Sequence, residues 1–209
     1  MILSGGTVVT SLDPVRVAAG DVHVVDGRVA ASGGGERHDC SGCLVVPGNV
    51  CAHTHLYSAL ARGMPYALEP PASFLQVLQR VWWRLDRALD EEGVRASVLV
   101  GGMEALLSGT TTLVDHHASP NAIDGSLDVV AGALQSVGVR SVLCYETSDR
   151  DGPERARAGV AENRRFGGRV RRDRPALVRA LVGAHASVTL SDETLAACVE
   201  AARELDSGI

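Results

Sequence analysis

The pattern of apolar and polar residues changes near residue 46 and divides the chain into two parts. Before that point, apolar residues occur in short strand-like runs, and two of these runs within residues 22–31 are separated by Asp26-Gly27. An Asp-Gly pair readily adopts the positive φ angles of a tight hairpin turn. Residues 1–46 therefore predict short strands in a small antiparallel sheet that packs beside a larger domain.

From residue 44 onward, strand-like runs alternate with amphipathic stretches of helical length. The predicted strands cover residues 44–52, 110–116, 139–145 and 176–184. The predicted helices, whose apolar residues recur with a period near 3.6, cover residues 74–85, 90–107, 126–136, 153–166 and 191–205. Strands separated by helices form a parallel sheet with right-handed crossovers. Two architectures fit this α/β order, a doubly wound sheet and a (β/α) barrel.

The polar residues that follow the strands favour the barrel. No glycine-rich phosphate-binding motif follows any predicted strand, which weakens the nucleotide-binding alternative. Polar and histidine residues instead cluster just after the strand ends, at His53, His55, Asp115, His116, His117, Glu146 and His185. This position is typical of barrel active sites, and a full barrel takes about 250 residues. Residues 47–209 hold about four strand–helix units, so they predict the first half of a (β/α)8 TIM-type barrel.

His53 and His55 follow the first strand of this barrel pattern. Side chains alternate between the two faces of a strand, so both imidazoles are expected to point the same way. Two imidazoles on one face can bind one divalent metal ion, although they could equally be hydrogen-bonded histidines at the mouth of a barrel. Zinc is the expected metal, and iron is compatible with the same ligands.

Composition excludes several functional classes. Apolar residues make up 45% of the chain, charged residues 22%, and the net charge is −5. The basic surface that nucleic acids and anionic membranes require is therefore not expected. The sequence shows neither a signal-peptide pattern nor an apolar run approaching the roughly 20 residues of a membrane span. Its five cysteines are odd in number and scattered, which favours reduced thiols and a cytoplasmic protein.

Several longer motifs resemble those of a known family. They are Val46-Pro47-Gly48 leading into His53-Thr54-His55, Leu60-Ala61-Arg62-Gly63, Trp82-Trp83-Arg84-Leu85-Asp86, Asp115-His116-His117-Ala118-Ser119-Pro120 and Gly183-Ala184-His185-Ala186. In this order, they resemble the amidohydrolase superfamily, in its deaminase and chlorohydrolase-like branch and closest to the SsnA-type aminohydrolases. The resemblance implies a metal-dependent hydrolase with a (β/α)8 barrel and a small β-sandwich built from both chain ends. Residues 1–46 would then be the N-terminal part of that sandwich.

The same resemblance implies roles for individual residues. His53 and His55 would be metal ligands, and His185 would contact the substrate near the leaving group. In the family, this histidine is usually followed by Ala, Pro, an aromatic residue and Thr. This chain has Ser187 in place of the Pro and Val188 in place of the aromatic residue. His116 and His117 are further candidates for substrate binding. Because they are adjacent on a strand, at most one of them can face inward.

The resemblance also implies the reaction, hydrolysis of a non-peptide C–N bond in a small nitrogenous, typically heterocyclic, substrate. In the family, a third histidine, a proton-shuttling glutamate and a metal-binding aspartate follow the fifth and later strands, and this sequence stops near where the fifth strand should begin. We therefore expect the 209-residue chain to be inactive alone and to self-associate through its open sheet edges. The alternative is a non-catalytic half-barrel that binds metal or assembles with a separately encoded second half. Trp82 and Trp83 are expected to pack within a helix.

Overall fold

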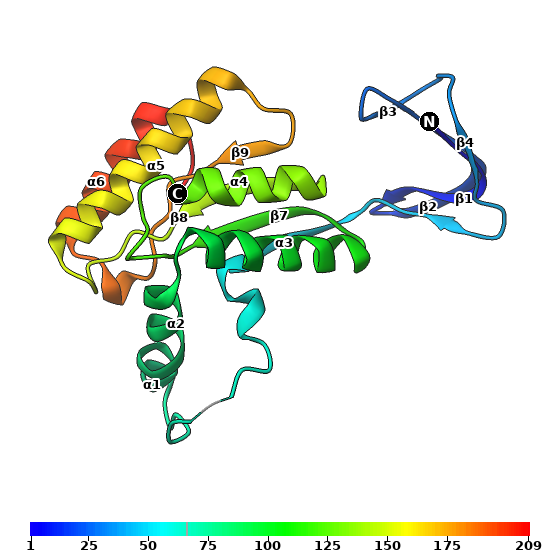
Figure 1. The fold of residues 1–209 in the computed structure, drawn as a ribbon. Coiled ribbons are helices and arrows are strands. Elements are labelled where there is room, and N and C mark those ends of the chain that lie inside the picture. The colour runs from blue at the N-terminus through cyan, green and yellow to red at the C-terminus, as the bar shows by residue number, and fades with distance from the viewer. Residues whose placement is uncertain (66) are drawn as a thin grey trace. The chain divides into compact units, whose positions relative to one another are not determined.

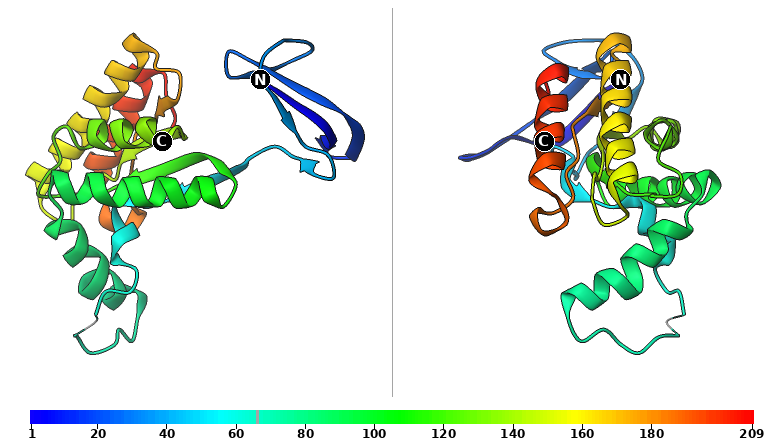
Figure 2. Two further views of the ribbon diagram at one scale, coloured as in Figure 1. Left: turned by 45° about the vertical axis from the view of Figure 1, so that its right-hand side comes forward. Right: turned by 90° about the vertical axis from the view of Figure 1, so that its left-hand side faces the viewer.

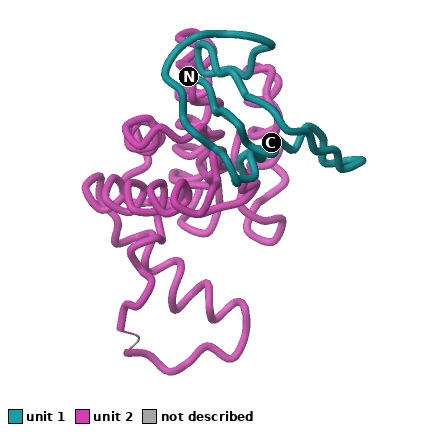
Figure 3. Tube along the Cα trace, turned by 90° about the vertical axis from the view of Figure 1, so that its right-hand side faces the viewer, with its two compact units in different colours: residues 1–48 teal, residues 49–209 magenta. Residues whose placement is uncertain are grey.

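A computed structural model describes residues 1–65 and 67–209 of the chain (Figure 1). Figure 2 shows the same ribbon from two further directions. The chain divides into two compact units, Met1–Gly48 and Asn49–Ile209, which are coloured separately in Figure 3. Each unit contains its own β-sheet, and each is therefore described by itself.

The first unit is a sheet in the order β3-β2-β1-β4, with β5 also paired to β1. Its strands are β1 (Ile2–Leu12), β2 (Val15–Val25), β3 (Arg28–Ala30), β4 (Arg37–Asp39) and β5 (Leu44–Val45). The predicted hairpin is confirmed, because β2 and β3 are antiparallel and Asp26 and Gly27 have φ angles of 50° and 72°. The prediction of short antiparallel strands is wrong in two respects: β1 and β2 have 11 residues each, and β4 and β5 run parallel to β1.

The second unit is built on a parallel sheet in the order β6-β7-β8-β9. Its strands are β6 (Asn49–Thr54), β7 (Thr110–His117), β8 (Arg140–Tyr145) and β9 (Val178–Ala180). Its helices are α1 (Phe74–Val77), α2 (Trp83–Ala88), α3 (Glu91–Leu107), α4 (Ser126–Val137), α5 (Pro153–Asp173) and α6 (Asp192–Leu205). Two 3₁₀-helices, η1 (Leu56–Ala61) and η3 (Ser187–Thr189), and one short π-helix, η2 (Leu78–Trp82), also belong to this unit. The predicted α/β order with parallel strands is confirmed.

Three predicted elements differ in their bounds. The strand predicted at residues 44–52 is divided, because β5 pairs in the first unit and β6 in the second. Pro47 lies between them and lacks the N–H that a continuous ladder needs. The helix predicted to end near residue 166 continues to Asp173. Within this extension Gly167 lets α6 approach closely, since an added Cβ would lie 2.7 Å from Leu205. The last strand is shorter than predicted, although a bridge joins Thr147 to Ala184 beyond it.

The main core of the second unit lies between one face of the sheet and helices α3, α4 and α5. Its most deeply buried members come from three strands and three helices and include Leu113, Leu143, Val178, Val98, Leu134 and Phe166. Burying one such side chain stabilises the fold by about 1.5–3 kcal/mol. The other face is more open, since Val50 is 64% exposed and Val114 is only partly buried. No helix in the described part of the chain is both long and apolar enough to cross a bilayer.

Candidate functional site

A cavity of about 700 Å³ lies within the second unit, among residues that follow the ends of β6, β8 and β9. Three histidines line it, His53, His55 and His185, together with the carboxyl group of Glu146 and the guanidinium of Arg150. Aromatic and aliphatic side chains from residues 74–83 form much of the remaining lining. The carboxyl ends of parallel strands are the usual place for binding sites in α/β proteins.

His53 and His55 bring their Nε2 atoms within 3.0 Å of each other. Two nitrogens bound to one zinc ion at about 2.0–2.1 Å are separated by about 3.0–3.4 Å for bond angles between about 95° and the tetrahedral value. The Nδ1 atom of His55 lies 3.0 Å from the carbonyl oxygen of His116. That contact assigns the proton to Nδ1 and leaves the Nε2 lone pair for a metal ion. The pair therefore fits one divalent cation.

The turn that carries His55 is fixed by two buried side chains. Asp115 accepts a hydrogen bond of 2.7 Å from the backbone N–H of Leu56, and Ser97 donates one of 2.8 Å to the Leu56 carbonyl. Asp115 is 0% exposed, and burial raises its pKa from 3.8 to about 7 against the lowering effect of the Leu56 bond. Asp115 therefore anchors this turn from the core side of β7.

His116 lies beside the histidine pair. Its ring stacks on that of His53 with a centroid separation of 4.3 Å, and its Nδ1 atom is 3.4 Å from the thiol sulfur of Cys144. Burial is the main cause that lowers the pKa of His116 to about 4, and the neighbouring His53 and His55 lower it further. The neutral ring of His116 is thus placed to fix the plane of His53.

His117 points to the opposite face of β7, as strand alternation requires. It is 0% exposed, its Nε2 atom lies 2.9 Å from the Ser119 hydroxyl, and its ring lies 6.0 Å from those of Tyr57 and Tyr145. Burial lowers its pKa to about 3. The residues that line the cavity do not include His117, so its predicted contact with substrate has no geometric support, and the side chain packs in the core.

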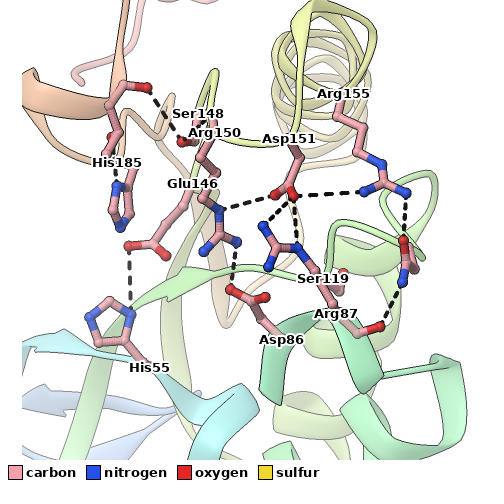
Figure 4. A network of polar contacts seen from close by, with 12 residues as sticks. His55, Asp86, Arg87, Ser119, Glu146, Ser148, Arg150, Asp151, Arg155 and His185 are labelled. Carbon is pink, nitrogen blue, oxygen red and sulfur yellow. Dashed lines mark hydrogen bonds and ion pairs between the residues drawn. The ribbon is translucent and has the colours of Figure 1, made fainter. Parts of the chain in front are cut away.

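His185 reaches the cavity from the segment after β9. Its Nδ1 atom lies 2.7 Å from the Thr189 hydroxyl, which itself donates to the carbonyl oxygen of Ala186 at 2.9 Å. Since that hydroxyl proton is already used, the His185 Nδ1–H donates to Thr189, and Nε2 remains an acceptor. Figure 4 shows the His185 ring directed toward the carboxylate of Glu146.

Glu146 is a cavity residue to which sequence reasoning gave only a position at a strand end. Its side chain is 10% exposed, and Oε1 lies 3.7 Å from His55 Nδ1 (Figure 4). Burial raises the pKa of Glu146 to about 8, and the charge of Arg150 acts in the opposite direction. A buried carboxyl group that borders a cavity is a candidate partner for a polar ligand.

Other lining residues were also missed. Trp82 and Trp83, which were expected only to pack within a helix, both line the cavity. Arg150 does so as well, although its position in the sequence gave no signal. Within residues 1–65 and 67–209, no group of three or more His, Cys, Asp or Glu side chains has metal-binding geometry. Among these residues the candidate metal centre therefore consists of two imidazoles.

The parallel α/β unit with histidines at its strand ends has the features of the barrel hydrolases that the motifs suggested. A family model, the amidohydrolase family, matches residues 44–209. The chain belongs to the amidohydrolase family. It is 31% identical over 200 residues to 5-methylthioadenosine/S-adenosylhomocysteine deaminase of Desulforudis audaxviator, an alignment that covers 91% of this chain and 44% of that protein. It is 35% identical over 137 residues to 8-oxoguanine deaminase of Pseudomonas aeruginosa, in an alignment that covers 60% of this chain and 30% of that protein.

Solved structures show the same fold. Guanine deaminase from C. acetobutylicum with bound guanine matches with a TM-score of 0.78 and 14% identity, over 99% of this chain and 51% of that one. A variant of atrazine chlorohydrolase from Arthrobacter aurescens TC1, in complex with zinc and atraton, matches with a TM-score of 0.73 and 22% identity. The match covers 98% of this chain and 51% of that one. Its relatives include deaminases of the branch that the motifs predicted, and the chain spans about half the length of the Desulforudis audaxviator protein and of these solved structures.

Proposed function

We propose that this chain is part of a metal-dependent aminohydrolase that releases ammonia from a small nitrogen heterocycle by hydrolysing a non-peptide C–N bond. The approach of His53 Nε2 to His55 Nε2 at 3.0 Å, inside a cavity that also contains Glu146 and His185, carries the proposal. The names of the relatives, deaminases of methylthioadenosine, S-adenosylhomocysteine and 8-oxoguanine, support the substrate class.

The proposed architecture follows from the same relationship. The four parallel strands of residues 47–209 would form the first half of a (β/α)8 TIM-type barrel, and residues 1–46 would form part of a β-sandwich. Support comes from the parallel order β6-β7-β8-β9 and from the likeness to half of each solved structure. The sheet face that includes Val50, 64% exposed, and the edge strands β6 and β9 favour self-association or pairing with further strands.

The residues of the cavity then have separable roles. When bound, a divalent cation, zinc first and iron as the alternative, supplies Lewis-acid activation of water near neutral pH. His53 and His55 hold it through Nε2, while the His116 carbonyl fixes the tautomer of His55. His185 contacts the substrate near its leaving group through the free Nε2. The aromatic side chains offer flat apolar surfaces that suit a heterocycle.

Two imidazoles are fewer protein ligands than the three of typical catalytic zinc sites. We therefore expect the 209-residue chain to bind zinc weakly and to show no turnover by itself. Equilibrium dialysis with metal analysis measures the first expectation. The wild type should retain zinc, and His53→Ala and His55→Ala should each lose it. The control His38→Ala, whose side chain is 48% exposed in the first unit, should bind as the wild type does.

The possible outcomes distinguish the alternatives. Unchanged zinc occupancy in the variant lacking both His53 and His55 would show that this pair is not the metal site. Ammonia release from 5-methylthioadenosine by the purified chain would overturn the expectation of inactivity while supporting the proposed reaction. Zinc binding without turnover, in the chain alone and after addition of a separately encoded second half, would favour a non-catalytic metal-binding role.

A further inference from the structure

Both tryptophans of the chain lie on one helical segment, and both line the cavity. The segment runs through α1, η2 and α2, from Phe74 to Ala88. We call Trp82 and Trp83 the tryptophan wall. The start of the segment is open to solvent, since Phe74 is 76% exposed and Leu75 is 54% exposed. The contacts that fix the position of the wall must therefore come mainly from the other end.

Arg150, in the loop after β8, joins that end at two points. Its Nη2 atom donates a hydrogen bond of 2.5 Å to Asp86 on α2, and its guanidinium lies over the Trp83 ring at 5.4 Å from the centroid. Its Nε atom lies 3.1 Å from Asp151. The side chains of Arg150, Asp86 and Asp151 are 10%, 1% and 7% exposed. Charge-assisted hydrogen bonds in such a buried setting are strong and directional.

A second connection runs beside the first, as Figure 4 shows. Arg87 of α2 forms an ion pair of 2.7 Å with Asp151, and Asn121 donates to the Arg87 carbonyl at 2.6 Å. Asp151 therefore keeps a cationic partner if Arg150 is removed. Asp86 would lose its hydrogen-bond partner, because Arg150 donates to its Oδ2 atom and its Oδ1 atom has no hydrogen-bond partner among the described residues. Of the two connections between the loop and α2, the Arg150–Asp86 contact is therefore the one that is lost when Arg150 is replaced, while Arg87–Asp151 remains.

We propose that Arg150 is a positioning residue that fixes the tryptophan wall against the loop after β8 and thereby sets the affinity of the cavity for flat heterocyclic ligands. The guanidinium contacts Asp86 of α2 along one edge and the ring of Trp83 on its face, and its Nε atom contacts Asp151 of its own loop, so it joins the loop to the segment that carries the wall. Only the kind of ligand rests on the proposed function; the positioning of the wall does not.

The test separates position from stability. Arg150→Met leaves the Asp86 carboxylate buried without its partner and should lower the melting temperature. The double variant Asp86→Leu/Arg150→Met removes both charges and fills similar volume, so its melting temperature should recover toward that of the wild type. Because the chain has only two tryptophans, selectively excited tryptophan fluorescence reports the wall alone. Arg164→Met is the control, since Arg164 pairs with the half-exposed Glu204 at 2.8 Å, away from the wall.

If Arg150 positions the wall, both Arg150 variants should show red-shifted emission and an acrylamide quenching constant raised about two-fold, even where stability recovers. The Arg164→Met control should keep the wild-type emission. A double variant with wild-type emission and quenching would show that Arg150 contributes stability alone, and the inference would be wrong. Should Arg150→Met fail to fold, the double variant still decides.

Ligand affinity is measured with adenine as a flat heterocyclic probe, followed by quenching of the same fluorescence. The dissociation constant should rise about tenfold in the double variant, equivalent to about 1.4 kcal/mol, and stay unchanged in Arg164→Met. Equal affinity of the wild type and the double variant would contradict the affinity part of the inference. No binding to the wild type would contradict both that part and the proposed substrate class, while the emission measurement judges the positioning of the wall independently.

Discussion

Asn163 on α5 is 0% exposed, and its amide bridges backbone segments on both sides. Its Oδ1 atom accepts hydrogen bonds from the N–H groups of Tyr145 at 2.9 Å and Gly183 at 3.2 Å. Its Nδ2 group donates to the carbonyl oxygens of Tyr145 at 2.9 Å and Gly159 at 3.1 Å. One side chain thus ties the end of β8 to the segment that follows β9.

The perturbation that tests this role is Asn163→Leu, which keeps the approximate volume and removes every polar atom. It leaves the N–H groups of Tyr145 and Gly183 without their side-chain acceptor. Each buried group left unpaired costs about 1–3 kcal/mol, so the expected loss of unfolding free energy is about 2–6 kcal/mol. Glu146 follows Tyr145 directly, and His185 lies two residues after Gly183, so both cavity groups should also lose their fixed positions.

Urea unfolding, monitored by far-ultraviolet circular dichroism, measures the loss of unfolding free energy, provided that the slope of free energy against urea concentration is the same in the variant and the wild type. The matched control is Gln135→Leu, which removes an amide from the exposed surface of α4 and should change stability by less than about 0.5 kcal/mol. A loss below about 1 kcal/mol for Asn163→Leu would mean that the two N–H groups find other partners. The reasoning that assigns the anchor to Asn163 would then be refuted.

Two further predictions concern the same region. The unfolding free energy of the wild type relative to Asp115→Asn should fall by about 3 kcal/mol as pH rises from 4 to 7, because burial raises the pKa of Asp115 to about 7 and the folded state holds a proton that the unfolded state has released. A difference that does not vary with pH in urea titrations would contradict this. Gly183→Ala should lower the unfolding free energy by about 3 kcal/mol or more, because its Cβ would lie 2.1 Å from the Tyr145 carbonyl oxygen. Gly168→Ala lies in α5 with open space around its Cβ and should raise the unfolding free energy by about 0.5–1 kcal/mol. Thermal melts compare the two glycine variants, and equal melting temperatures would count against the steric argument.

Local sequence predicted most of the elements because local bonds decide their type. Asp90 accepts a hydrogen bond from the N–H of Gly93 at the start of α3, and Ser191 accepts one from the N–H of Thr194 before α6. Both helices therefore begin near the residues at which their predicted ranges begin. The division of the strand near Pro47 could not be predicted in this way. It depends on which sheet supplies the partner, since β5 pairs with β1 whereas β6 pairs with β7.

The candidate site was predictable to the extent that its residues form short motifs. His53, His55 and His185 were selected from such motifs, and all three line the cavity. Arg150 and Asp86 were not assigned, because they are 64 residues apart in sequence and their roles arise only from their contact. Hydrophobic periodicity and short motifs describe only residues that are near one another in sequence, so they cannot predict a contact between residues that are far apart in sequence.

Apart from His53, which lies in β6, the polar groups of the cavity follow the strands, so their positions depend on side-chain contacts beyond the regular ladders. Asp115 fixes the turn after β6, Asn163 fixes the end of β8 and the segment after β9, and Arg150 joins the loop after β8 to α2. Asp115 and Asn163 are fully buried and Arg150 nearly so, where a satisfied hydrogen bond is strong and a broken one is costly. Asp115 and Arg150 each act on one segment, whereas Asn163 acts on two. Loss of one anchor should therefore displace the cavity groups on the segments that it holds and leave the other cavity groups in place.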